Sequence, residues 1–205
     1  MTRLRTLSFV LAALLLAPAA RAIEPVYDYA NLRVGAFLPQ GSSVRDFNSG
    51  LDLELAVGRA FLPYLVGEFS IGYASAETDP YLARYQSAQG GTYPSIEMRE
   101  GYQMVPVTLT VKAVLPAGSI EPWIGGGAGV AWARIHQDPT GSEPTISQTD
   151  ATFEYHAGAG VTVQLGKRWY AGADLRYAFA KVKWFNEPDV ALDGLRVTAA
   201  VGTRF

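Results

Sequence analysis

Ionisable side chains recur inside apolar segments of this sequence, mostly flanked by hydrophobic residues. In one segment Asp52 and Glu54 alternate with Leu51, Leu53 and Leu55. A period of two places successive side chains on opposite faces of a β-strand, so the charged and apolar residues occupy different faces. Charges of both signs on one face can form ion pairs or carry out acid–base chemistry. The set comprises five acidic residues (Asp52, Glu54, Glu68, Glu154, Asp174), five basic residues (Arg33, Lys112, Arg176, Arg196, Arg204) and His156.

His156, two residues after Glu154, is the candidate for enzymatic chemistry. A histidine can act as the base that activates a hydroxyl nucleophile for lipid deacylation, provided that the nucleophile lies within hydrogen-bond reach. His156 and Glu154 lie on the same polar face of the predicted strand. In the sequence, no Ser or Thr is beside His156 together with an acid that could orient the imidazole. We therefore expect a buried structural histidine, no catalytic residue and a protein that is not an enzyme.

Metal and cofactor binding have no support in the sequence. The two histidines, His136 and His156, are far apart, and the chain has no cysteine. The run from Gly125 to Gly129 resembles a phosphate-binding loop only superficially, because such a loop must connect a strand to a helix. Here the sequence continues as a strand through Trp132. We expect the glycines to mark a bend beside the bulky Trp123.

Eight alternating segments position these residues. The gaps between the segments are alternately short and long, and the long gaps collect Gly, Pro, Ser, Asp and Thr. This layout is typical of outer-membrane barrels, which have short turns on one side and longer loops on the other. The predicted strands cover 26–38, 50–60, 64–76, 101–115, 120–136, 152–165, 169–184 and 194–205, with short gaps at 61–63, 116–119 and 166–168 and long gaps at 39–49, 77–100, 137–151 and 185–193.

The N-terminus has the pattern of a secretory signal peptide. Arg3 and Arg5 precede an apolar stretch over 7–16, and Ala20-Arg21-Ala22 matches an A-x-A cleavage site. We expect a signal peptide over 1–22 and one mature, exported domain over 23–205. Without the three arginines of this leader, 14 basic residues stand against 19 acidic ones, a formal charge of −5. No basic patch indicates nucleic-acid binding.

A membrane barrel explains the segments better than a soluble β-sandwich, although both folds have one apolar and one polar face. The polar faces carry Gly and Ala between the charges, which suits a narrow interior. No segment after the leader reaches the roughly 18 apolar residues of a membrane helix, so only a closed barrel could span a membrane. The apolar faces end in aromatic residues, as interfacial girdles require. The predicted girdle comprises Tyr73, Trp132, Tyr155, Tyr177 and Phe179 at one interface and Trp169 and Phe205 at the other.

We therefore predict an all-β, eight-stranded, antiparallel, up-and-down transmembrane β-barrel. Four segments also carry a family resemblance: Arg33-Val34-Gly35, Val105-Pro106-Val107-Thr108-Leu109 followed by Pro116, Glu121-Pro122-Trp123-Ile124-Gly125-Gly126-Gly127, and the terminal Phe205. The mature chain resembles the small eight-stranded outer-membrane barrels of the OmpA/OmpW-like type. The resemblance implies a Gram-negative-type outer membrane, and a barrel-assembly machinery that reads Phe205 as an assembly signal.

The resemblance does not specify an activity, because such barrels serve as anchors, adhesins, conduits and enzymes. An eight-stranded interior is just wide enough to be filled by side chains. We expect a non-enzymatic, structural or surface-binding barrel whose lumen is filled by paired charges. The main alternative is the porin-like conduit for small hydrophobic solutes that the OmpW-like resemblance implies, and an enzyme that modifies lipid A is a third.

Two outward regions are candidates for contact with partners. Arg134, Lys181 and Lys183 follow Trp132 and Phe179 on the outward phase, where they could meet lipopolysaccharide phosphates or remain ordinary solvated charges. The gap 77–100 contains tyrosines among Gly and Ser, a composition suited to adaptable contacts. It could bind a surface ligand or cap the barrel mouth.

Overall fold

All described segments of the chain except short connections are β-strands. The fold is seen in a computed structural model that describes residues 27–83, 96–115, 117–139, 145–184 and 187–205. The predicted signal peptide over 1–22 lies outside the described residues. No helix in the described part is long and apolar enough to cross a membrane. The strands are β1 (Asp28–Pro39), β2 (Gly50–Leu62), β3 (Leu65–Glu77), β4 (Tyr81–Ala83), β5 (Ile96–Val114), β6 (Ile120–Pro139), β7 (Ile146–Gln164), β8 (Trp169–Trp184), β9 (Glu187–Ala191) and β10 (Gly194–Arg204).

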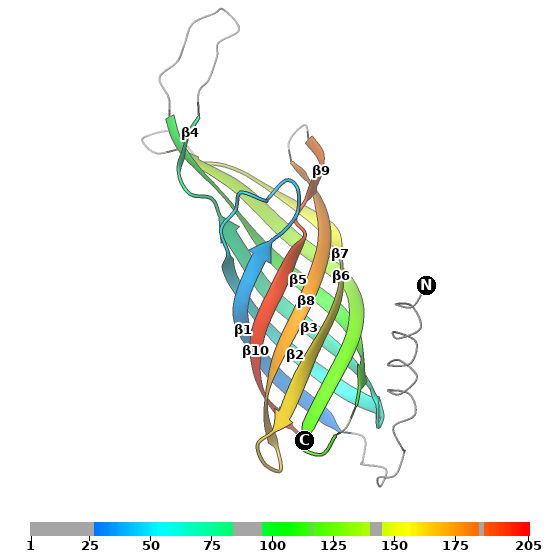
Figure 1. The fold of residues 1–205 in the computed structure, drawn as a ribbon. Helices are drawn as coiled ribbons and strands as arrows, with labels where there is room; N and C mark the ends of the chain where they lie inside the picture. The colour runs from blue at the N-terminus through cyan, green and yellow to red at the C-terminus, as the bar shows by residue number, and fades with distance from the viewer. Residues whose placement is uncertain (1–26, 84–95, 116, 140–144, 185–186) are drawn as a thin grey trace, which may run out of the picture.

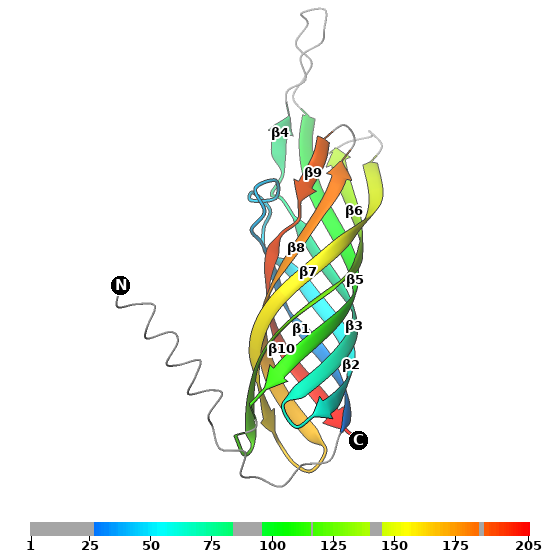
Figure 2. The same cartoon turned by 90° about the vertical axis from the view of Figure 1, so that its right-hand side faces the viewer.

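Eight of these strands form a closed antiparallel ring, as predicted (Figure 1). The order is β1-β2-β3-β5-β6-β7-β8-β10, and β10 returns to pair with β1 from Tyr29↔Arg204 to Pro39↔Gly194. Closure leaves no unpaired edge around the ring, which is the condition for strands to lie in lipid. Both described termini lie at the end of the ring with the short turns. We call this the turn end and the opposite end the loop end (Figures 1 and 2).

The loop end contains more strand than the sequence predicts. β5 begins at Ile96 rather than near 101, β6 continues to Pro139, and β7 begins at Ile146 rather than near 152. The gaps 77–100 and 185–193 also contain the short strands β4 and β9, which pair with β5 and β8. These extensions rise above the ring (Figure 2). Their polar residues occupy both faces, so the alternation that revealed the other strands is missing here.

The outer wall of the ring is apolar and exposed. Leu55 is 55 % exposed, Leu109 66 % and Ile124 63 %, whereas their neighbours Glu54, Thr110 and Trp123 point inward and are buried. A one-residue slip in register would place the whole apolar set inside, so the burial pattern fixes the register of each strand.

The interior holds side chains rather than an open bore, and its composition changes along the axis. Phe37, Tyr102, Met104 and Leu192 form the centre of a buried apolar cluster at the loop end. Tyr29 and Tyr170 belong to a smaller apolar cluster at the turn end. Between the two clusters lie most of the charged side chains, and one pair, Arg204 and Glu121, lies at the turn end.

Candidate functional site: the charged interior

The predicted charged residues all lie on inward faces of the ring. Ten of the eleven are buried, and Arg204 at the turn end is partly buried. They come from seven strands, β1, β2, β3, β5, β7, β8 and β10. Distances divide them into three clusters, which we name after Arg33, Arg196 and Arg204.

The Arg33 cluster balances three cations against three carboxylates. The Arg33 guanidinium bonds Glu54, lies 2.6 Å from a Glu68 carboxylate oxygen and places its Nε 2.6 Å from Asp174 Oδ2. Lys112 Nζ donates to Glu68 at 2.6 Å, as does the Tyr29 hydroxyl. Arg176 donates to both oxygens of Glu54, at 2.8 and 2.9 Å. The cluster joins β1, β2, β3, β5 and β8 across the interior.

The Arg196 cluster lies beside the apolar cluster of the loop end. Arg196 Nη2 donates to Glu154 Oε2 at 2.9 Å, and Arg196 Nε lies 3.6 Å from Asp52 Oδ2. One guanidinium therefore serves two carboxylates. His156 Nδ1 lies 3.8 Å from Glu154 Oε1.

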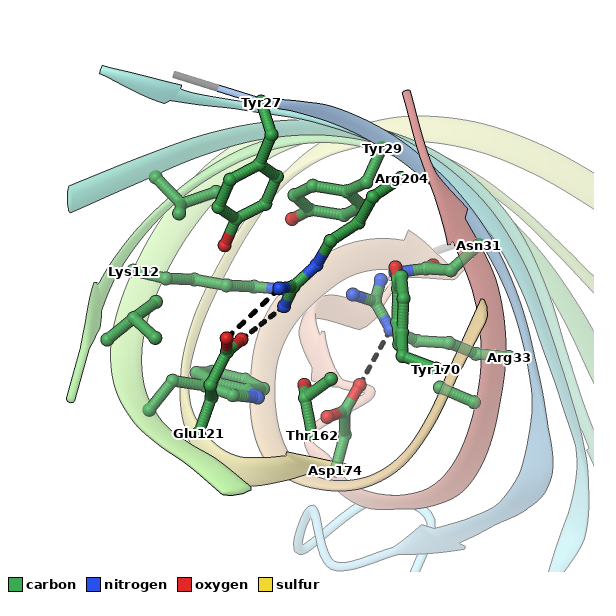
Figure 3. Close-up of a pocket in the computed structure, with 14 residues that line it drawn as sticks. Tyr27, Tyr29, Asn31, Arg33, Lys112, Glu121, Thr162, Tyr170, Asp174 and Arg204 are labelled. Atoms are coloured by element: carbon green, nitrogen blue, oxygen red, sulfur yellow. Dashed lines mark hydrogen bonds and ion pairs between the residues drawn. The ribbon is translucent and has the colours of Figure 1, made fainter. Parts of the chain in front are cut away.

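The Arg204 cluster closes the turn end and includes a residue that the sequence analysis missed. Arg204 donates to both carboxylate oxygens of Glu121, one of them at 3.0 Å, and its guanidinium stacks 4.4 Å from the centre of the Tyr27 ring (Figure 3). Between this pair and the Arg33 cluster is a small cavity of about 40 Å³, lined in part by Trp123 and Asp174. Glu121 lies two residues before Trp123 and therefore faces the interior as Trp123 does. This alternation is the sequence signal that could have identified Glu121.

Glycines on the inward faces let polar side chains meet across an intervening strand. Thr110, Gly127 and His156 are register neighbours on β5, β6 and β7. A Cβ at Gly127 would lie 2.7 Å from His156 Nε2, so only glycine leaves room for the imidazole. The same arrangement brings Tyr29 to Glu68 over Gly58 and Asn31 to Tyr170 over Gly202. Gly127 thus makes room for a polar contact, a role that the predicted bend did not include.

The expectation that His156 has no hydroxyl beside it is wrong. Thr110 Oγ1 lies 2.9 Å from His156 Nε2. Glu154 lies on the opposite side of the imidazole, next to Nδ1. These are the residue types of a nucleophile, a base and an orienting acid. All three are buried inside the barrel, where they face other interior side chains rather than the outer wall. The contact spans 46 residues and was therefore invisible in the local sequence.

The predicted girdle residues lie on the outward face of the ring. Tyr73 and Tyr177 are half-buried, and Trp132, Tyr155, Trp169, Phe179 and Phe205 are exposed. Phe61 and Tyr64, both 59 % exposed at the turn end, belong to the same surface and were missed because they flank a turn. Arg134, Lys181 and Lys183 are also exposed, on the extended upper parts of β6 and β8.

The region predicted as the loop 77–100 is partly structured. β4 pairs with β5, and the Tyr81 hydroxyl donates to Glu100 at 2.5 Å. Residues 84–95, which include Tyr85 and Tyr93, lie outside the described part. Within the described residues, no group of three or more His, Asp or Glu side chains is placed to hold a metal ion.

A family model described as "Outer membrane protein beta-barrel domain" matches residues 7–205. The chain belongs to this outer-membrane barrel family. The closed ring, the apolar outer wall and the family together place the protein in an outer membrane. None of the curated proteins compared with the chain matches it.

Solved structures of other outer-membrane barrels share the fold at low sequence identity. Neisserial surface protein A is 15 % identical, with 90 % of this chain and 100 % of that chain covered and a TM-score of 0.54. A major outer membrane protein from Thermus thermophilus is 14 % identical (89 % and 100 % covered, TM-score 0.55). The attachment invasion locus protein Ail of Yersinia pestis is 11 % identical (88 % and 97 % covered, TM-score 0.51). At these identities the likeness shows the fold alone.

The ion pairs of the barrel interior predict strong effects of single substitutions. Arg196→Ala leaves Asp52 and Glu154 without their cation, and Glu68→Ala leaves Arg33 and Lys112 underpaired. Each should lower the free energy of unfolding by about 3–5 kcal/mol, because an unpaired buried charge is costly. Urea unfolding of the refolded barrel in detergent micelles measures the loss.

Arg59→Ala is the matched control, because Arg59 pairs with Asp28 on the exposed surface. Its effect should be about 0–1 kcal/mol. If Arg196→Ala and Glu68→Ala are no worse than this control, the charges do not hold the interior together.

Proposed function

We propose that this protein is a closed, non-enzymatic outer-membrane barrel with a structural and surface-binding role. The observation that supports it is that several ion pairs cross the bore between strands that are not neighbours in the ring. Arg204 on β10 pairs with Glu121 on β6, and Arg176 on β8 pairs with Glu54 on β2. Pairs that bridge opposite walls occupy the path that a solute would need. The apolar cluster adds a second obstruction at the loop end.

A conduit for small hydrophobic solutes is the second candidate, and one feature of the wall favours it. The β7–β8 ladder ends at Glu154↔Ala180. Above it, Thr152 Oγ1 donates to the Lys181 carbonyl and Asp150 Oδ2 accepts from the Lys183 amide at 3.0 Å. Side-chain hydrogen bonds thus replace backbone pairing between the upper parts of β7 and β8. Ala180 and Val182, which belong to the apolar cluster inside, lie on this part of β8.

Conductance and uptake separate the closed barrel from the conduit. In planar bilayers the purified barrel should show no steady openings, because the charged clusters block the bore. Vesicles containing it should take up a small hydrophobic dye no faster than empty vesicles. Steady openings, or uptake that rises in the double variant Asp150→Ala/Thr152→Ala, would contradict the closed barrel and support the conduit.

An enzymatic role has less support. The Thr110, His156 and Glu154 side chains face the packed interior. Release of acyl chains from lipid A by the purified barrel would replace our proposal with an enzyme.

Arg134, Lys181 and Lys183 form the proposed contact with lipopolysaccharide. They lie beyond the exposed rings of Trp132 and Phe179, where cations can reach phosphates at the membrane surface. A basic side chain near an anionic membrane surface contributes about 1 kcal/mol. The contact would anchor the loop end of the barrel in the outer leaflet.

Neutralising these three residues to Gln should remove about 3 kcal/mol of stabilisation in lipopolysaccharide-containing bilayers, at about 1 kcal/mol for each residue, and little in detergent. Thermal unfolding in the two media measures the difference. The matched control neutralises Arg59, Lys167 and Arg168, which are exposed at the turn end. Equal losses for both triple variants would refute a specific contact at the loop end.

Phe205 is the proposed recognition site of the barrel-assembly machinery. It is 74 % exposed, and its backbone exchanges hydrogen bonds with Asp28 at 2.9 and 3.1 Å. Deleting Phe205 should reduce the amount of barrel inserted in cells several-fold, while refolding in detergent yields a barrel of nearly unchanged unfolding midpoint. Equal defects in both assays would make Phe205 a stability residue instead.

The β4–β5 hairpin is the proposed surface-binding region. Leu82 is 69 % exposed and Tyr81 41 % exposed at the top of the molecule (Figure 1). Such residues contribute contact area to binding sites. Cells that display the barrel should adhere less to a solid surface when both residues become Ser; unchanged adhesion would exclude this hairpin.

A further inference from the structure

The charges inside the closed ring do not balance, counted over the described residues. The cationic side chains are Arg33, Lys112, Arg176, Arg196 and Arg204, and the carboxylates are Asp52, Glu54, Glu68, Glu121, Glu154 and Asp174. Six carboxylates face five cations, so the interior carries one excess negative charge when His156 is neutral.

The excess lies in the Arg196 cluster. The Arg33 cluster pairs three cations with three carboxylates, and the Arg204 cluster pairs one with one. In the remaining cluster Arg196 alone serves Asp52 and Glu154, at 3.6 and 2.9 Å. Asp52 is 2 % exposed and Glu154 is fully buried. Among the described residues, Asp52 Oδ2 and Glu154 Oε1 have no hydrogen-bond partner.

The surroundings of these two carboxylates do not supply the missing positive charge. Arg176 and Glu54 of the Arg33 cluster interact with both carboxylates, but Arg176 is already bonded to Glu54 through two hydrogen bonds. His156 on β7 faces Glu154, and its second nitrogen is bonded to Thr110 of β5. Arg196, Arg176, Glu54 and Glu68 also act on the imidazole. Tyr102 of β5 also faces Arg196, as a neutral phenol in the apolar cluster.

An uncompensated charge in a buried site is more costly than uptake of a proton. We propose that the Arg196 cluster is a binding site for one proton, shared among Asp52, Glu154 and His156. The proton makes the interior neutral and removes the charge of one of the two carboxylates. Groups that interact this closely titrate as a unit, so the proton belongs to the cluster.

The proton makes stability depend on pH in a defined direction. In the unfolded chain carboxyl groups are ionised above about pH 5, and histidine is neutral above about pH 7. Between about pH 7 and pH 8.5 the folded barrel therefore holds one more proton than the unfolded chain. Unfolding releases it, so the unfolding equilibrium constant rises about tenfold for each pH unit and stability falls as the pH rises.

The test compares the pH dependence of urea unfolding in micelles, followed by tryptophan fluorescence, for the wild type and Glu154→Gln. Glu154→Gln removes the excess charge and keeps the side-chain shape. It should abolish the tenfold dependence on pH and leave the barrel at least as stable as the wild type at pH 8.5. Asp52→Asn removes the same charge and serves as the second variant if Glu154→Gln does not refold.

Glu121→Gln is the matched control, because it removes a carboxylate from the separate, balanced Arg204 cluster. It should be less stable than the wild type at every pH and retain the tenfold dependence. Two results would overturn the proposal. One is equal pH dependence in the wild type and both Arg196-cluster variants. The other is a wild-type stability that follows sodium concentration at constant ionic strength and not pH.

Discussion

Backbone hydrogen bonding between β10 and β1 is the constraint on which the rest of this molecule depends. In lipid every backbone donor and acceptor must be hydrogen-bonded within the protein. A β-sheet satisfies all of these groups only when it closes into a barrel. Closure with eight strands gives an interior just wide enough for side chains. Every inward residue must therefore fit against residues from the opposite wall. Large side chains and glycine consequently occupy neighbouring inward positions.

The narrow interior explains why the charges form compact clusters. The charges lose most of their hydration there, so each guanidinium needs carboxylates within hydrogen-bond distance. Arg33 meets this need with partners from three different strands, β2, β3 and β8. A planar guanidinium with five donors suits such a role better than an ammonium group does. Lys112, the one buried lysine among the described residues, accordingly lies at the edge of the same cluster, 4.5 Å from the centre of the Trp123 ring.

The period of two was sufficient to predict the ring and the inward side of each strand, because register and burial follow from it directly. Asp52 and Glu54 could be assigned to the interior from their apolar neighbours alone. The extra length of β5, β6 and β7 could not be predicted, because both faces of these extensions are polar. Which charges pair could not be predicted either: the contact of Thr110 with His156 depends on the stagger of three strands and on Gly127 between them.

The pair between Glu54 and Arg176 joins residues 122 positions apart, and Asn31 reaches Tyr170 over 139 positions. Such contacts close loops of more than half of the 205-residue chain, so they form only after most of the ring is in place. Ion pairs also join the two halves of the ring: Arg176 of β8 pairs with Glu54 of β2, and Arg33 of β1 pairs with Asp174 of β8. A partly assembled ring would expose unpaired charge to the membrane. Folding of the ring is therefore all-or-none, because the interior charges are fully paired only when β1 and β10 have paired.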